Sequence, residues 1–239
     1  MVAIDREAWL ERVRSVWNER SSSWDEMSQA NAVAPDRAAD LDRIVAALAI
    51  EPGERILDAG CGTGQYALAF AERGYRVTAV DLAPDMVARA QAHAAARNMP
   101  ITFRIESIGA LSDPLAVYGA IHARVVLQFV PNIPEALAEL RRVLKPSKRM
   151  LVSVPGALSP IYNRSWRRHI EPEAMGSNFV TPWELEEILI SLGWTVLDQW
   201  GDLGQNMSGD ANAFTPDDVA RLPLRLQQAA ATTWTFIVR

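Results

Sequence analysis

The sequence predicts an α/β fold in which helices cover both faces of a parallel, doubly wound sheet. Short apolar runs alternate with helical patterns from residue 55 to residue 155, as they do in successive βαβ units. The first run leads directly into a glycine-rich stretch, DAGCGTG at 58–64, and the second run ends in Asp81. With 239 residues, of which 49% are hydrophobic and 22% charged, the chain has the composition of one globular domain with additions.

Two helices are predicted ahead of this alternation. Trp9, Val13 and Trp17 recur at helical spacing between residues 5 and 20, whereas the stretch ERSSSWDEMSQANAVAPD breaks that period and predicts a loop. A second helix carries apolar residues up to Leu48 and closes at Pro52-Gly53. We therefore expect residues 1–35 to form an N-terminal helical cap and residues 36–239 to form the core.

The core elements follow in order along the chain. Strands are predicted in RILDAG (55–60), YRVTAVD (75–81), ITFRI (101–105), VYGAIHARVVLQF (117–129), RMLVSV (149–154), WTVLDQW (194–200) and TWTFIVR (233–239). Helices are predicted at 65–74, 83–98, 133–146 and 182–192, the last preceded by a Thr181–Glu184 capping box. Residues 156–180 and 201–231 do not fit the alternation and are predicted to be insertions of the kind that carry binding loops.

The glycine stretch lies where an open parallel sheet binds ligands, beyond the carboxyl end of a strand. Gly60, Gly62 and Gly64 permit positive φ and leave no Cβ to obstruct a ligand, and the next helix points its free N–H groups at the same place. Asp81 follows Gly64 by 17 residues and can accept hydrogen bonds from a ribose diol. These features indicate a nucleoside ligand, and the alternative is a tight turn followed by a capping aspartate.

The spacing of the glycines argues against a dinucleotide. The dinucleotide fingerprint reads G-x-G-x-x-G/A, but here the pattern is G-x-G-x-G and Gln65 occupies the third position of the fingerprint. The negative charge of Asp58 beside the loop would repel a pyrophosphate and would suit an ammonium group. A nicotinamide-dependent oxidoreductase is therefore disfavoured.

Two stretches of the sequence resemble a known family. The stretch ILDAGCGTGQYALAFAERGYRVTAVDLAPDMVARA is similar to the first two motifs of class I S-adenosylmethionine-dependent methyltransferases, and LQFVPNIPEALAELRRVLKPSKRMLVSVPG is similar to their segment from the fourth to the fifth strand. The resemblance covers about residues 40–155. It implies a Rossmann-like sheet of seven strands with an antiparallel last strand, and a substrate pocket capped by the N-terminal helices and the 156–180 insertion.

The resemblance also implies roles for particular residues. Asp58 would hold the methionine amino group through the loop and an ordered water, and Asp81 would bind the ribose hydroxyls. Trp24, next to Asp25, would form an aromatic lid, or alternatively anchor the cap. The other implied cofactor contacts are Gly60, Cys61, Gly62 and Gly64 in the loop, Leu82 and Met86 beside the adenine ring, and Ser107 and Ile108 after the third strand.

Three positions depart from the family pattern. Ser107 stands where an aspartate usually accepts a hydrogen bond from the adenine amino group, and Glu106 is an alternative acceptor. Gly119 replaces an aspartate that commonly opens the fourth strand, and LKPSKR replaces LKPGG. We expect these changes to lower cofactor affinity without abolishing binding.

Methyl transfer depends mainly on proximity, and a general base is needed only if the acceptor must lose a proton. His169 in the first insertion is the candidate base, while His93 is expected at the surface and His122 in the core. Arg124 is expected either to reach the cofactor carboxylate or an anionic acceptor, or to end its strand in solvent. The residues expected to line the acceptor pocket, or else to cover the sheet edge, are Tyr162, Arg164 and Trp166.

The function predicted from these observations is methyl transfer from S-adenosylmethionine, with S-adenosylhomocysteine as product, to oxygen or nitrogen of a small aromatic or heterocyclic molecule. The alternative is an inactive protein that binds the cofactor and regulates a partner. A net charge of −5 argues against nucleic acid, and the single cysteine gives no metal-ligand spacing. A charged N-terminus and the lack of a long apolar run predict a cytoplasmic protein with no membrane partner. We expect it to be a monomer or a homodimer.

Overall fold

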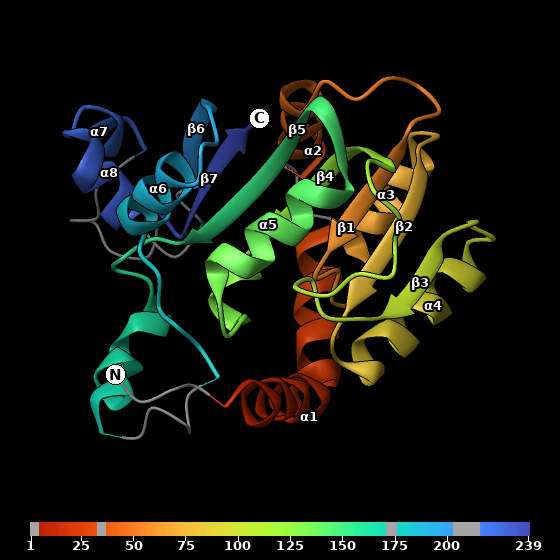
Figure 1. The fold of residues 1–239 in the computed structure, drawn as a ribbon, viewed down its shortest axis with the longest axis horizontal. Helices are drawn as coiled ribbons and strands as arrows, with labels where there is room; N and C mark the ends of the chain where they lie inside the picture. The colour runs from red at the N-terminus through yellow and green to blue at the C-terminus, as the bar shows by residue number, and fades with distance from the viewer. Residues whose placement is uncertain (1–4, 33–36, 171–175, 203–215) are drawn as a thin grey trace.

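The computed structural model describes residues 5–32, 37–170, 176–202 and 216–239, and these form a seven-stranded sheet with helices on both faces (Figure 1). The strand order is β3-β2-β1-β4-β5-β7-β6, and β7 runs antiparallel to both of its neighbours. The predicted fold class is therefore confirmed, including the antiparallel last strand. The strands are β1 (Arg55–Ala59), β2 (Arg76–Asp81), β3 (Thr102–Ile105), β4 (Tyr118–Arg124), β5 (Leu144–Pro155), β6 (Val196–Asp202) and β7 (Thr233–Val238).

The helices divide between the two faces of the sheet. Helices α2 (Arg37–Leu48) and α3 (Gln65–Glu72) cover one face, with α4 (Pro84–Ala96) beside them on β2 and β3. Helices α5 (Ile133–Val143) and α6 (Pro182–Ser191) cover the other face. The N-terminal helix α1 (Arg6–Ala32) lies beyond the carboxyl ends of β1 to β3, where the strand order predicts a ligand site (Figure 1).

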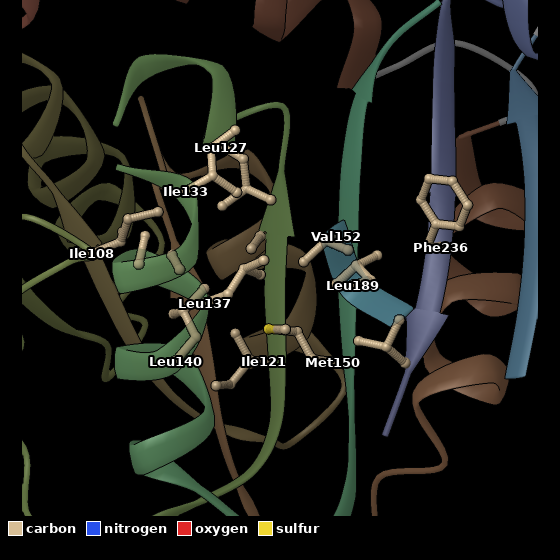
Figure 2. Packing of buried hydrophobic residues seen from close by; sticks show 14 of the residues in the cluster. Ile108, Ile121, Leu127, Ile133, Leu137, Leu140, Met150, Val152, Leu189 and Phe236 are labelled. Atoms are coloured by element: carbon tan, nitrogen blue, oxygen red, sulfur yellow. The ribbon is translucent and has the colours of Figure 1, made fainter. Parts of the chain in front are cut away.

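The larger hydrophobic core lies between the sheet and the helices α5 and α6. Leucines on α5 face isoleucine, methionine and valine side chains of β4 and β5, and Phe236 of β7 extends the same layer (Figure 2). Strand positions alternate between this core and the smaller one beneath α2 and α3, because successive strand side chains point to opposite faces. The sheet is thus fixed from both sides, and the carboxyl ends of its strands are held in register.

The prediction that the first helix ends near Arg20 is wrong, since α1 continues to Ala32. Its buried positions include Trp9 and Val13 in its first half and Ser21 and Asp25 further along; within each pair the spacing of four residues puts both members on one face. The last two are polar and buried, with exposed fractions of 4% and 6%, so hydrophobic periodicity cannot detect them. The predicted boundary of the cap at residue 35 lies outside the described residues.

Strand β5 begins at Leu144, five residues before the predicted start at Arg149, and its first part is irregular. The register against β4 shifts between Tyr118 and Ala120, and Ser147 adopts a positive φ of 62° in the bulge. The Lys148 ammonium lies 2.7 Å from the Glu54 carboxylate, which fills the space beside Gly119. A Cβ at that glycine would lie 2.6 Å from the Glu54 carboxyl carbon, so the departures at 119 and 145–149 belong to one ion-paired arrangement.

The two predicted insertions contain local structure. The first holds the 3-10 segment η2 (Pro160–His169), and the second holds α7 (Pro216–Ala220) and α8 (Leu224–Ala230). Tyr162 fastens η2 to the core by donating a hydrogen bond of 2.6 Å from its hydroxyl to the Val180 carbonyl. In the part of the chain that the structure describes, no helix is long and apolar enough to cross a membrane.

Candidate functional site

The glycine loop connects β1 to α3 at the centre of the sheet. Gly60, Gly62 and Gly64 adopt φ values of 78°, 53° and 85°, as the sequence predicted for a loop that needs left-handed backbone. The loop is fixed to β2, because the amides of Gly60 and Cys61 donate hydrogen bonds of 2.8 and 2.9 Å to the Val80 carbonyl. Larger residues do not fit, since a Cβ at position 60 would lie 2.4 Å from Val126 Cγ2.

Asp81 ends β2 beside this loop. Its carboxylate accepts hydrogen bonds of 2.9 Å from the backbone amides of Gly62 and Ala83, one at each oxygen. Burial raises the pKa of this carboxyl although the backbone hydrogen bonds oppose the shift, and the nearby Asp58 charge raises it further. Each carboxylate oxygen has a second lone pair, so the group can also accept from a diol. The prediction that Asp81 holds a ribose fits this orientation.

Asp58 and His122 form a buried pair behind the loop. They lie opposite each other on the neighbouring strands β1 and β4, and His122 Nδ1 is 2.8 Å from Asp58 Oδ1. Both residues are almost fully buried, and the histidine ring packs against Tyr66 with ring centroids 4.4 Å apart. His122 lies in the core, as predicted, but its hydrogen bond to Asp58 was not predicted.

Helix α1 brings aromatic side chains to the glycine loop. A Cβ at Gly62 would lie 3.5 Å from the indole nitrogen of Trp24, which places this ring directly at the loop. Trp17 packs edge-on against Trp24 and Phe129, with ring centroids 5.2 and 5.1 Å apart. The aromatic cluster of Trp17, Trp24 and Phe129 therefore lies between α1 and the turn that follows β4, and a role as a lid stays a prediction.

A hydrogen-bonded pair of side chains fastens this part of α1 to α4. His93 Nε2 lies 2.8 Å from Asp25 Oδ1, and the Gln29 amide donates a 3.0 Å hydrogen bond to Asp25 Oδ2. His93 keeps 24% of its side chain exposed, as expected near the surface, but its ring also closes the contact between two helices, which was not predicted. Sequence reasoning could not find this pair, since its members are 68 positions apart and neither belongs to a motif.

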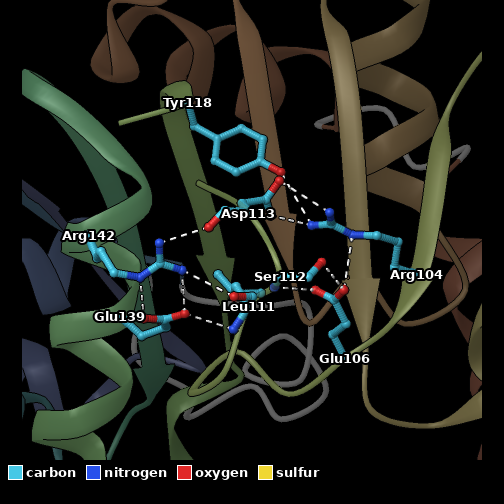
Figure 3. A network of polar contacts seen from close by, with 8 residues as sticks. All are labelled: Arg104, Glu106, Leu111, Ser112, Asp113, Tyr118, Glu139 and Arg142. Carbon is cyan, nitrogen blue, oxygen red and sulfur yellow. Dashed lines mark hydrogen bonds and ion pairs between the residues drawn. The ribbon is translucent and has the colours of Figure 1, made fainter. Parts of the chain in front are cut away.

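A polar network shapes the segment after β3 (Figure 3). Arg104 pairs with Asp113, and Glu106 accepts a 2.6 Å hydrogen bond from the Ser112 hydroxyl. Arg142 adds two hydrogen bonds to the backbone carbonyls of the same segment, at Leu111 and Asp113. The Glu106 carboxylate is thus used inside the segment, and the Ser107 hydroxyl oxygen accepts a 3.3 Å hydrogen bond from the Gly109 amide. Contact of either residue with an adenine amino group stays a prediction.

Arg124 is directed toward β6. Its guanidinium donates a 3.2 Å hydrogen bond to Asp202 and lies 5.5 Å from the Tyr66 ring centroid. Burial opposes the charged form, but Tyr66 and Asp202 together raise the pKa of the guanidinium. A cofactor contact by Arg124 stays a prediction, and the structure shows that its charge already has a carboxylate partner.

The remaining candidate residues are placed less closely together. Met86 and Ile108 are buried, with exposed fractions of 1% and 4%, and Leu82 is half-buried beside Asp81. Arg164 and Trp166 are exposed on η2, where Tyr162 acts as an anchor. The side chain of His169, the predicted base, lies outside the described residues. Burial and the charges of Asp81 and Asp58 raise the pKa of the Cys61 thiol, so this residue stays protonated and is a poor nucleophile.

Comparisons with known proteins agree with this geometry. The malonyl-acyl-carrier protein O-methyltransferase of Serratia marcescens is 38% identical over 116 residues, which cover 48% of this chain and 44% of that protein. The ubiquinone biosynthesis O-methyltransferase of Xanthomonas campestris pv. campestris (strain B100) is 34% identical over 116 residues, which cover 47% of each protein. The chain thus spans about half the length of these curated relatives.

A solved structure shows that the fold is shared over most of the chain. The SAM-dependent methyltransferase from Aquifex aeolicus superimposes with a TM-score of 0.63 at 15% identity, covering 92% of this chain and 97% of that one. Residues 56–147, which contain the glycine loop, Asp81 and the segment after β3, match the family described as a methyltransferase domain. Residues 56–147 therefore form a methyltransferase domain, and the fold around them is shared with S-adenosylmethionine-dependent methyltransferases.

Proposed function

We propose that this protein transfers a methyl group from S-adenosylmethionine to an oxygen atom of a small aromatic acceptor. The observation that carries the proposal is the combination of a glycine loop, a carboxylate at the end of β2 and an aromatic cluster over the loop. When bound, S-adenosylmethionine supplies an electrophilic methyl group on a positively charged sulfur. The contribution of the chain is then to orient this group and to exclude water.

The residues present fit the cofactor at several points. Gly62 leaves the loop without a Cβ beside the Trp24 ring, and Asp81 is held by two backbone amides in an orientation from which it can accept from a ribose. Asp58 Oδ2 is buried without a hydrogen-bond partner among the described residues, which is costly for a carboxylate unless a ligand or water supplies a donor. An ammonium group on the loop side of Asp58 would supply it.

The choice of an oxygen acceptor is supported by the relatives, since both proteins named above are O-methyltransferases. The aromatic nature of the acceptor is supported by the cluster of Trp17, Trp24 and Phe129, because ring contacts with such residues stabilise a planar substrate. His93 and His122 each bond an aspartate, so neither offers a free base. An acceptor that is ionised at neutral pH, such as an aromatic carboxylate, would need none.

The test is transfer of a radiolabelled methyl group from S-adenosylmethionine to benzoate-type, catechol-type and aniline-type acceptors, with products identified by mass spectrometry. We expect methyl esters or ethers from the oxygen acceptors, at a rate that is independent of pH near neutrality for carboxylates. Transfer to amines alone would overturn the assignment to oxygen. Cofactor binding without transfer to any acceptor of the panel would favour the regulatory alternative.

A further inference from the structure

We propose that His122 is a positioning residue that holds the Asp58 carboxylate in place for the ammonium group of the cofactor. The inference rests on the proposed function, because it assigns a task to a residue that does not itself touch the cofactor. It would make β4 part of the cofactor site through a contact to β1. The evidence lies in strand register, burial and the unequal use of the two Asp58 oxygens.

Strand register places the pair. Asp58 is opposite His122 in the β1–β4 ladder, and the side chains of both residues point to the face of the sheet that α2 and α3 cover. The exposed fractions are 2% for Asp58 and 1% for His122, so bulk water does not compete with the hydrogen bond between them. The Nδ1 to Oδ1 distance of 2.8 Å is that of a well-formed, charge-assisted hydrogen bond.

Each side chain of the pair uses only one of its two polar atoms in a hydrogen bond. Asp58 Oδ2 and His122 Nε2 are both buried and have no hydrogen-bond partner among the described residues. The Nδ1 to Oδ1 distance is that of a hydrogen bond in which Nδ1–H donates to Oδ1. Oδ2 then stays available for a cation or a bridging water.

The imidazole ring is itself fixed. Tyr66, at the start of α3, packs against it at 4.4 Å between ring centroids, and Phe70 packs edge-on at 5.3 Å. These contacts hold the ring in one orientation and therefore limit rotation of the Asp58 carboxylate about its own bond. Since Tyr66 lies two residues beyond Gly64, the same contacts tie the carboxylate to the helix that follows the glycine loop.

The test compares two ligands and two substitutions at one position. S-adenosylhomocysteine carries the amino-acid group, whereas 5′-methylthioadenosine has the same adenine, ribose and sulfur without it. In calorimetric titrations we expect His122→Phe to lower the affinity for S-adenosylhomocysteine by roughly tenfold or more, which is the effect of one charged hydrogen bond. The affinity for 5′-methylthioadenosine should change by less than about twofold. His122→Asn, whose amide can stand near the former Nδ1, should restore much of the lost affinity.

A purely structural role for His122 predicts a different pattern. Equal weakening of both ligands, or failure of His122→Asn to improve on His122→Phe, would overturn the inference. Asp58→Asn serves as the second variant, because it should reproduce the selective loss of S-adenosylhomocysteine even if His122→Phe does not fold. If the wild-type chain bound neither ligand, the proposed function itself would fail and this inference with it, whereas selective loss supports both.

Discussion

A matched set of glycine substitutions tests whether the glycine loop is packed as described. Gly60 and Gly53 have nearly the same φ, 78° and 77°. A Cβ at Gly60 would lie 2.4 Å from Val126 Cγ2, whereas a Cβ at Gly53 would have no heavy atom within 4 Å. Both alanine variants therefore place a side chain at the same positive φ, and only Gly60→Ala adds a steric clash.

The expected magnitudes follow from these contacts. A non-glycine residue in left-handed conformation costs about 1–2 kcal/mol, and this cost is common to both variants. Forcing a methyl group into a packed site costs roughly 1–3 kcal/mol more. We therefore expect the free energy of unfolding of Gly60→Ala to fall below that of Gly53→Ala by about 1–3 kcal/mol. The loop must also shift to relieve the clash, so Gly60→Ala should bind S-adenosylhomocysteine more weakly than Gly53→Ala does.

Urea denaturation followed by circular dichroism measures the difference directly, provided that the variants share one dependence on denaturant. A second pair repeats the comparison, because Gly64 and Gly74 both have φ of 85° but only a Cβ at Gly64 meets another atom closely, at 2.8 Å from the Ala90 Cβ. If the alanine variants within each pair lost equal stability, the close contacts around the loop would be refuted.

Three further predictions concern single side chains. Trp24→Leu should weaken the binding of S-adenosylmethionine by roughly 0.5–1 kcal/mol more than the binding of S-adenosylhomocysteine, since only the former carries a sulfonium charge that an aromatic face attracts. Equal weakening of the two affinities would leave Trp24 as an anchor alone. Burial raises the pKa of Asp81, so this carboxylate is protonated at a higher pH than an ordinary aspartate. As the pH is lowered, affinity for either ligand should therefore begin to fall above the ordinary aspartate range. The same fall in affinity in the Asp81→Asn variant would contradict this. Burial opposes ionisation of Asp113, but Arg104 lowers the pKa of that carboxyl, so the carboxylate stabilises the fold above its ordinary pKa and that stabilisation is lost as the pH falls through the lowered value. Asp113→Asn should therefore reduce stability at neutral pH by about 1–3 kcal/mol in thermal or urea unfolding, with a smaller difference in acid, and an unchanged variant would refute the role of the pair.

The parts of the fold that sequence predicts well are those with a local signature. Apolar runs predict the strands of the core, and Gly60, Gly62 and Gly64 indicate a loop whose backbone requires positive φ. The position of Asp81 follows from the same pattern, because parallel strands end at one edge of the sheet. These features depend on residues close together in the chain, and the structure confirms their placement.

The parts that sequence misses depend on buried polar pairs between distant segments. Helix α1 continues past Arg20 because Ser21 and Asp25 face inward, and Asp25 is satisfied by His93 from α4. The pairing of His122 with Asp58 requires knowledge of strand register, which no local pattern reveals. In each case the stabilising contact is a hydrogen bond formed only after the fold brings the segments together.

The departures from the family pattern are also explained only by tertiary contacts. Gly119 and the bulge at 145–149 look like separate losses in the sequence. In the structure the Glu54 carboxylate fills the space beside Gly119 and pairs with Lys148 at 2.7 Å, and these contacts lower the pKa of Glu54 although burial opposes the shift. The arrangement lies at the opposite end of β4 from the glycine loop, so it concerns stability and not the cofactor site.

The central claim is that the glycine loop and Asp81 hold an adenosyl ligand, and calorimetric titration of the wild-type chain tests it most directly. S-adenosylmethionine and S-adenosylhomocysteine should each bind saturably at one site, NAD should not compete, and Asp81→Ala should abolish binding while the exposed control Asp85→Ala leaves it unchanged. The absence of binding to both adenosyl ligands, or their displacement by NAD, would contradict the claim.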